Sequence, residues 1–130
     1  MKQIAINTDR KRTLVDITDQ VARAIGREDG VWLVYVPHTT AGITINEGAD
    51  PDVARDILMT WERLVPEDWP YRHAEGNAPA HVMACLAGSS VLVGVADGEL
   101  KLGTWQSIFF CEFDGPRKRQ VWLLPSTIAG

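Results

Sequence analysis

The sequence predicts an α+β fold, an antiparallel β-sandwich with its helices grouped on one side. Three observations support this prediction. Short β-prone segments are joined by tight turns, and the longer helical segments follow one another in the middle of the chain instead of alternating with strands. A length of 130 residues with 45% hydrophobic residues is typical of one globular domain. We therefore expect a single domain over residues 1–130, without a linker or an internal repeat.

The N-terminal third predicts two short strands, a short helix and a longer strand. Residues 2–8 alternate apolar and polar side chains, and turn-forming residues precede residues 14–18, so we expect an opening hairpin. A helix is expected to begin at Asp19 and to end at Gly26. Residues 31–37 form a continuous apolar run, which is typical of a strand buried on both faces.

The remaining elements are two helices followed by three strands. Asp50 and Pro51 form a helix-opening signal, and apolar residues then recur at helical spacing as far as Pro66. A second helix is expected between the N-cap Asn77 and Gly88. The three strands read SVLVGVA, TWQSIFFCEFD and RQVWLLP, and they are separated by Asp-Gly turns.

Composition excludes several classes of function. The net charge is −4 and the isoelectric point is near 5.3, with one dense basic run at residues 117–119, so we expect no nucleic-acid partner. No segment approaches the roughly 20 apolar residues of a membrane span, so we expect a soluble protein with no membrane partner. Cys85 and Cys111 lie in apolar surroundings, which predicts buried, reduced thiols and a cytoplasmic location.

The three histidines are candidate metal ligands. His38 follows the apolar run, His73 lies in a polar loop, and His81 is near the start of a helix. The positive end of a helix dipole disfavours the imidazolium form of His81, which would leave a neutral ligand for a divalent metal. Spacing alone agrees equally well with three unrelated histidines, and that alternative stays open.

Two polar groups near these histidines could bind a ligand. Glu75 and Asn77 precede free helix N–H groups, which suits an anion such as phosphate, although an ordinary N-cap beside a solvated glutamate is the simpler interpretation. Beside His38, neutral side chains could donate hydrogen bonds to a ligand, with Glu47 as a candidate general base or metal-supporting carboxylate, although threonines in strands are usually just good strand formers. These side chains are Thr39, Thr40, Thr44 and Asn46.

Residues 103–106, Gly-Thr-Trp-Gln, combine a small residue, a flat ring and an amide, which together could support a ring-shaped ligand. The alternative is that Trp105 packs in the core and Gln106 begins a strand. Glu112 alternates with phenylalanines, so it points either to solvent or inward to the site.

The ordered motifs resemble the YjbQ family. The resemblance rests on four consecutive blocks, HTTAGITINEGADPDV (38–53), HAEGNAPAH (73–81), SVLVGVADGELKLGTWQSI (90–108) and FFCEFDGPR (109–117). One departure is Gly94, where the family often has proline; it lies in a strand and should alter local stiffness.

This resemblance implies a jelly-roll-like domain that assembles as a homotrimer. It also implies the activity of a secondary thiamine-phosphate synthase, which joins a pyrimidine diphosphate to a thiazole phosphate and releases pyrophosphate. Carried over to this sequence, the metal ligands would be His38, His73 and His81, with zinc as the expected metal and magnesium as the choice for a transferase. Around them would lie Glu47, Glu75, Asn77, Trp105 and Gln106.

Two other functions use the same residues. A zinc-dependent hydrolase of a small phosphorylated or heterocyclic substrate would activate water on the metal, with Glu47 or Glu75 as the base. A non-catalytic module would bind a metal or a phosphorylated ligand without turnover.

Overall fold

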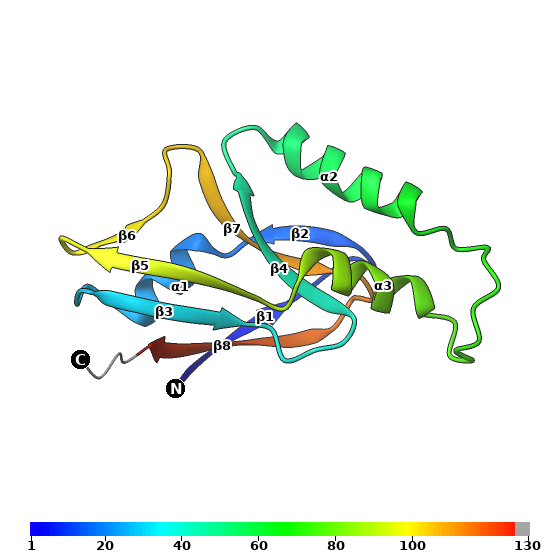
Figure 1. Ribbon diagram of the computed structural model, residues 1–130, viewed down its shortest axis with the longest axis horizontal. Helices are drawn as coiled ribbons and strands as arrows, with labels where there is room; N and C mark the ends of the chain where they lie inside the picture. Colours follow the sequence, from blue (N-terminus) through cyan, green and yellow to red (C-terminus); the bar gives the residue numbers. More distant parts are fainter. Residues whose placement is uncertain (127–130) are drawn as a thin grey trace.

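The computed structural model describes residues 1–126 and contains two antiparallel sheets and three helices, as predicted for the fold class (Figure 1). The five-stranded sheet has the order β1-β8-β3-β5-β6, and the three-stranded sheet has the order β2-β7-β4. The strands are β1 (Lys2–Asn7), β2 (Thr13–Asp16), β3 (Gly30–Tyr35), β4 (Ala41–Glu47), β5 (Ser90–Ala96), β6 (Glu99–Lys101), β7 (Gln106–Glu112) and β8 (Lys118–Ser126). The helices are α1 (Thr18–Ile25), α2 (Pro51–Leu64) and α3 (Ala78–Ala87).

The main core lies where the inner faces of the two sheets meet. Phe110 of β7, Val34 of β3 and Leu123 of β8 are fully buried there, together with Val21 of α1. A smaller cluster, which includes Met83 of α3, packs α3 against the three-stranded sheet. The two clusters fix α3 and the strands relative to one another, and the candidate site depends on that arrangement.

The helix signals in the sequence are confirmed, with one difference. Asp50 caps α2, because its Oδ1 accepts a hydrogen bond of 2.9 Å from the backbone N–H of Asp52. Asn77 precedes α3 as predicted, but its side chain does not cap the helix. Its Nδ2 instead donates to Oδ2 of Asp114 over 2.9 Å. This hydrogen bond ties the start of α3 to the segment after β7.

The predicted opening hairpin is wrong. β1 pairs with β8 in one sheet, whereas β2 pairs with β7 in the other. Thr8 directs this crossing, because its backbone N–H donates to the carbonyl of Arg117 and its hydroxyl donates to the buried Glu112. The segment after β1 is therefore held against β8 and does not turn back on itself.

Two predictions about burial are also wrong. The strand β3 buries only one face, since Val34 is fully buried whereas Val31 is 42% exposed. This burial on one face is ordinary for an antiparallel sheet. Cys111 is buried as expected, but Cys85 is exposed on α3.

Among the three helices of residues 1–126, none combines the length and the apolar character that a membrane-spanning helix needs.

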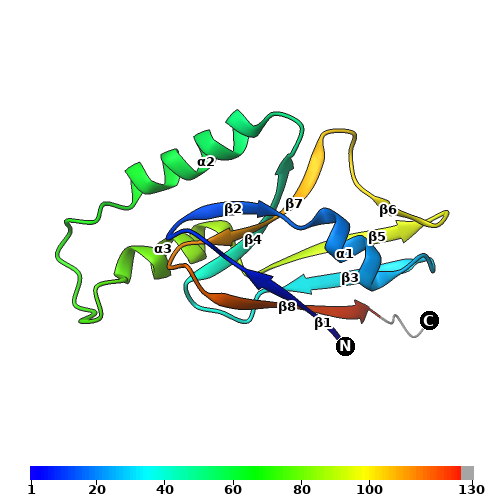
Figure 2. The same cartoon turned by 180° about the vertical axis from the view of Figure 1, so that it is seen from behind.

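The helices occupy two regions of the molecule. Helices α2 and α3 lie near each other beside the three-stranded sheet, and α3 packs mainly on β4 (Figure 1). Helix α1 packs against β1 and β7, toward the end of the molecule away from α3 (Figure 2). The strand β4 crosses the molecule between these regions and separates the two groups of predicted site residues.

Candidate functional site

A cavity of about 340 Å³ lies at the start of β4, between the β3–β4 loop, the N-terminus of α3 and the start of β8. It contains six of the predicted site residues, His38, Thr39, Thr40, Glu75, Asn77 and His81. Its remaining walls are Pro37, Arg117 and Arg119. A volume of this size suits one small ligand.

A buried ion pair forms one wall of this cavity. Glu112 is fully buried and Arg119 is only 4% exposed. Arg119 Nε donates to Glu112 Oε1 over 2.9 Å, and its Nη2 donates to the other carboxylate oxygen. The same Nη2 donates to the Thr40 hydroxyl over 2.9 Å. These bonds fix the arginine and connect the wall to the β3–β4 loop.

Glu112 is ionised within this network. Burial alone would raise the pKa of its carboxyl group, but hydrogen bonds from Arg119 and Thr8 outweigh that effect. The net result is a pKa below the ordinary glutamate value. Of the two orientations considered for Glu112, the inward one is therefore observed, and its partner is an arginine.

His38 is held in one tautomer by the backbone. Its Nε2 accepts a hydrogen bond of 3.0 Å from the N–H of Gln120. Burial and, secondly, the charge of Arg119 lower its pKa, so the ring is neutral near pH 7 and carries its proton on Nδ1. Because the lone pair on Nε2 already accepts this bond, His38 in this position can donate a hydrogen bond from Nδ1 but offers no free lone pair to a metal.

His81 and His73 lie next to each other but differ in access to the cavity. Their ring centroids are 5.1 Å apart and the planes meet at 81°, an edge-to-face contact. His81 lines the cavity, whereas the cavity walls do not include His73. The side chain of His73 is 43% exposed and its Nε2 lies 3.7 Å from the Glu75 carboxylate.

The three histidines therefore do not fit a common metal ion within one protomer. In residues 1–126, no group of three or more His, Cys, Asp or Glu side chains is placed to hold a metal. His38 would first have to give up its hydrogen bond from Gln120. The predicted metal site stays a prediction, and the geometry of the cavity points to hydrogen bonding instead.

The other predicted site residues lie at the far end of β4. Glu47 pairs in register with Gln106, and the backbone carbonyl of Trp105 accepts from the N–H of Gly48. Trp105 is 64% exposed, so the alternative that it packs in the core is wrong. Asn46 Oδ1 accepts a hydrogen bond from the backbone of Glu47. None of these residues lines the cavity that contains His38 and His81.

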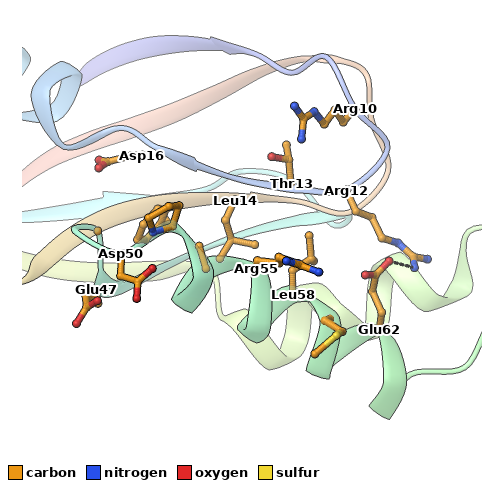
Figure 3. A pocket seen from close by; sticks show the side chains of 15 residues that line it. Arg10, Arg12, Thr13, Leu14, Asp16, Glu47, Asp50, Arg55, Leu58 and Glu62 are labelled. Carbon is orange, nitrogen blue, oxygen red and sulfur yellow. Dashed lines mark hydrogen bonds and ion pairs between the residues drawn. The ribbon is translucent and has the colours of Figure 1, made fainter.

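Glu47 instead borders a second cavity of about 610 Å³ between α2 and the three-stranded sheet (Figure 3). Leu14, Leu58 and Phe109 contribute apolar surface to it. Arg12 forms an ion pair with Glu62 at 3.1 Å, at the end of this cavity away from Glu47. The cavity is larger than the histidine cavity but contains only one of the predicted site residues, Glu47.

The length of β4 separates these two groups of residues. Thr40 adjoins the histidine cavity, and Glu47 ends the strand seven residues later. At about 3.3 Å per residue, the two ends are roughly 20 Å apart. Glu47 therefore cannot act as a base on a small ligand in the histidine cavity of its own protomer.

Sequence reasoning missed Arg119 and gave Glu112 only a secondary place. A signal for both existed in the strand alternation. Arg119 has the same phase along β8 as the buried Val121 and Leu123, and Glu112 continues the buried series of Phe110. Charged residues in the phase of the core require buried partners of opposite charge, so the two could have been predicted to pair.

Comparisons with known proteins agree with this fold. The family described as UPF0047 protein YjbQ-like matches residues 2–126. A UPF0047 protein of Methanocaldococcus jannaschii is 49% identical over 121 residues, covering 91% of this chain and 88% of that protein. The UPF0047 protein YugU of Bacillus subtilis is 46% identical over 129 residues, covering 95% of this chain and 96% of that protein.

Solved structures show the same similarity. An uncharacterised conserved protein of the YjbQ/UPF0047 family from Clostridium acetobutylicum superimposes with a TM-score of 0.92 at 47% identity, covering 97% of this chain and all of that one. A conserved hypothetical protein from Thermus thermophilus gives the same TM-score and coverage at 41% identity.

Proposed function

This chain belongs to the YjbQ-like UPF0047 family, and from that premise we propose that it is a small transferase resembling secondary thiamine-phosphate synthase. In the proposed reaction, the C–O bond between the pyrimidine methylene and its diphosphate breaks, and the electron pair leaves with pyrophosphate. The thiazole nitrogen of the second substrate forms the new C–N bond. The observation that supports the proposal is the cavity that places Arg119, His38 and His81 at the start of α3.

The proposed role of this cavity is to stabilise the departing pyrophosphate. Negative charge grows on the leaving group as the C–O bond breaks, so fixed donors aimed at that charge lower the barrier. Nδ1–H of His38, the guanidinium of Arg119 and the positive end of α3 are such donors. No step of this scheme runs through a metal, since the histidines do not converge on one.

The proposed site is completed by a neighbouring copy of the chain. A transfer reaction needs both substrates together, but the exposed Trp105 and the half-buried Glu47 lie about 20 Å from the histidine cavity of the same protomer. In a homotrimer, each protomer would bring Trp105 and Glu47 to the cavity of the next one. Trp105 would then stack on the heterocycle, and the Glu47 carboxylate would stabilise the positive charge that develops on the pyrimidine methylene as the C–O bond breaks.

The apolar outer face of the five-stranded sheet supports assembly. Leu92 is 64% exposed and aligns with Leu33, which in turn aligns with Leu124. We expect a homotrimer by light scattering at micromolar concentration, and we expect Leu92→Glu to weaken it because a charge would be buried in the contact. Arg55→Glu, on α2, is the matched control. A monomeric wild-type protein would contradict the shared site.

Mixing inactive variants tests the shared site directly. His81→Ala removes a side chain from the histidine cavity and Trp105→Ala removes one near the other end of β4, so each homotrimer should be inactive. After unfolding and refolding as a mixture, roughly one site in four should combine two intact halves, as expected for a ring of identical contacts. Activity that does not return on mixing would contradict a site shared between protomers.

The activity itself is tested with the two precursors. We expect thiamine phosphate and pyrophosphate to form in equal amounts only when both substrates are present, and His81→Ala to reduce the rate at least tenfold. The reaction is run with chelator, with zinc and with magnesium. Release of phosphate from one substrate alone would indicate the hydrolase, and saturable binding without any product would indicate the binding module.

We also propose that the protein works in the cytoplasm. Both cysteines are free thiols, and Cys85 is exposed. Exposed free thiols are typical of a reducing compartment.

A further inference from the structure

Helix α2 lies beside the three-stranded sheet without filling the space between them, since none of its 14 residues is buried. Leu58 and Trp61 in its C-terminal half pack against the smaller core cluster. Arg12, just before β2, donates to Glu62 of α2 and to Glu67 beyond it. These contacts hold the helix in place, and the larger cavity of about 610 Å³ remains open between α2 and β2 (Figure 3).

Apolar side chains from three elements line this larger cavity. They are Leu14 of β2, Phe109 of β7, and Ala54 and Leu58 of α2. Asp16 aligns with Phe109 across the sheet, so its side chain lies on the same face as that ring. The cavity therefore combines an apolar surface, which suits the body of a small organic molecule, with charged side chains at its ends.

One end of the larger cavity is acidic. Asp16 and Asp50 lie there on opposite walls, and Glu47 adds a further negative charge (Figure 3). Both aspartates are exposed, so a ligand can reach them. Asp16 accepts from Thr18 through Oδ1, and its Oδ2 accepts from none of the described residues. In the described chain no three such side chains are placed to hold a metal, so an amine is the partner that suits this end.

The other end of the larger cavity is basic. Arg55 comes from α2 and Arg10 from the segment before β2 (Figure 3). Arg55 is exposed and forms no ion pair with the described residues, while Arg10 lies 3.9 Å from Asp9 in a fully accessible pair. Guanidinium groups donate two parallel hydrogen bonds to a carboxylate or a phosphate. Along α2, the rise per residue separates Asp50 from Arg55 by about 7.5 Å.

We propose that the larger cavity binds a small dipolar ligand, in which an apolar, ring-sized body separates an amine from an anionic group. The amine would donate to Asp16 and Asp50, and the anionic group would accept from Arg55 and Arg10. A ligand with a single charge would leave one end of the cavity without a partner, so complementarity favours the dipolar one. The inference goes beyond the proposed function, because the two cavities have no residue in common.

The test compares three probes of similar shape by calorimetry at pH 7. The dipolar probe is 4-(aminomethyl)benzoate, which carries an amine and a carboxylate at opposite ends of a benzene ring. The analogue 4-methylbenzoate lacks the amine, and 4-methylbenzylamine lacks the carboxylate. We expect the dipolar probe to bind at least about tenfold more tightly than either analogue, because each end adds a charge-assisted hydrogen bond. A dipolar probe that binds no better than either analogue, or that does not bind, overturns the proposal.

Two variants assign the preference to the two ends. Arg55→Gln removes a cation, so the dipolar probe should bind about tenfold more weakly and its preference over 4-methylbenzylamine should fall. Asp16→Asn keeps the oxygen that accepts from Thr18 but removes the charge, so the preference over 4-methylbenzoate should fall. Arg63→Gln and Asp56→Asn make the same changes on α2 outside this cavity and should leave affinity unchanged. An affinity that both cavity variants leave unchanged contradicts the proposal.

A further variant establishes which cavity holds the probe. Loss of binding in His81→Ala would place the dipolar probe in the histidine cavity and overturn the inference. Arg55 and Asp16 are exposed, so their variants should fold, and circular dichroism of each one establishes this before binding is compared. Turnover is not measured, so failure of the transferase assay and failure of dipolar binding are separate results.

Discussion

Replacing Glu112 with alanine is expected to lower the free energy of unfolding by about 3–5 kcal/mol, because the substitution leaves the Arg119 charge buried without its partner. Arg119 is only 4% exposed and two of its nitrogens donate to Glu112. Thr8 would also lose the acceptor of its hydroxyl. Urea unfolding followed by tryptophan fluorescence measures the loss at one fixed protein concentration, since assembly contributes to stability.

A double variant separates the ion pair from the loss of packing. Replacing both Glu112 and Arg119 with methionine removes both charges and keeps side-chain volume, so it should restore much of the stability lost in Glu112→Ala. If Glu112→Ala lowers the free energy of unfolding by less than about 1 kcal/mol, Arg119 does not depend on Glu112 as its buried partner.

Acid should affect the same contact. The pKa of Glu112 is lower in the folded protein than its ordinary value. A carboxyl group with a depressed folded pKa stabilises the protein above its unfolded pKa, about 4.3, and loses that contribution as pH falls through the folded pKa. We therefore expect the stability difference between the wild type and Glu112→Gln to be full at pH 6 and to shrink below about pH 4.

Replacing Phe110 with alanine is expected to cost about 3–5 kcal/mol of stability, whereas replacing Trp105 should cost under about 0.5 kcal/mol. Phe110 is fully buried in the main core, and Trp105, at the start of the same segment, is 64% exposed. The same unfolding experiment compares the two variants, and the retained stability of Trp105→Ala makes that variant suitable for the mixing test.

A larger loss of stability in Trp105→Ala than in Phe110→Ala would contradict the exposed position of Trp105. A large stability loss in Trp105→Ala would mean that the ring is buried, either in the fold or in the contact between protomers. Measuring unfolding at two protein concentrations distinguishes these cases, because only a contact between protomers makes the loss depend on concentration.

Local features of the fold were predictable because their causes lie within a few residues. Asp50 and Pro51 start α2, and Asp50 forms the predicted cap. The turn at Asp97-Gly98 joins β5 to β6, with positive φ values of 55° and 74° that suit a tight hairpin. Each of these signals depends on backbone geometry and on hydrogen bonds between near neighbours.

Features that depend on distant pairing were not predictable from spacing. The sequence did not indicate that β1 and β2 enter different sheets, or that His38 Nε2 would be occupied by the backbone of Gln120, 82 residues away. Which strands pair depends on how much apolar surface the whole sheet buries, and not on neighbouring residues alone. A motif that is continuous in sequence can also run along a whole strand, so that its two ends lie far apart.

By itself, the sequence determined the class of fold, most helix and strand positions, the family and the residue types available for chemistry. Only the tertiary structure decided which of those residues share a cavity. His38, Asn77 and His81 line the same cavity, whereas Glu47 and Trp105 lie about 20 Å away, near the other end of β4. Arg119 also lines the cavity, where it is held by its buried ion pair with Glu112. The physical reason is that helix caps and turns are local, whereas a site is formed by side chains whose positions depend on sheet register and burial.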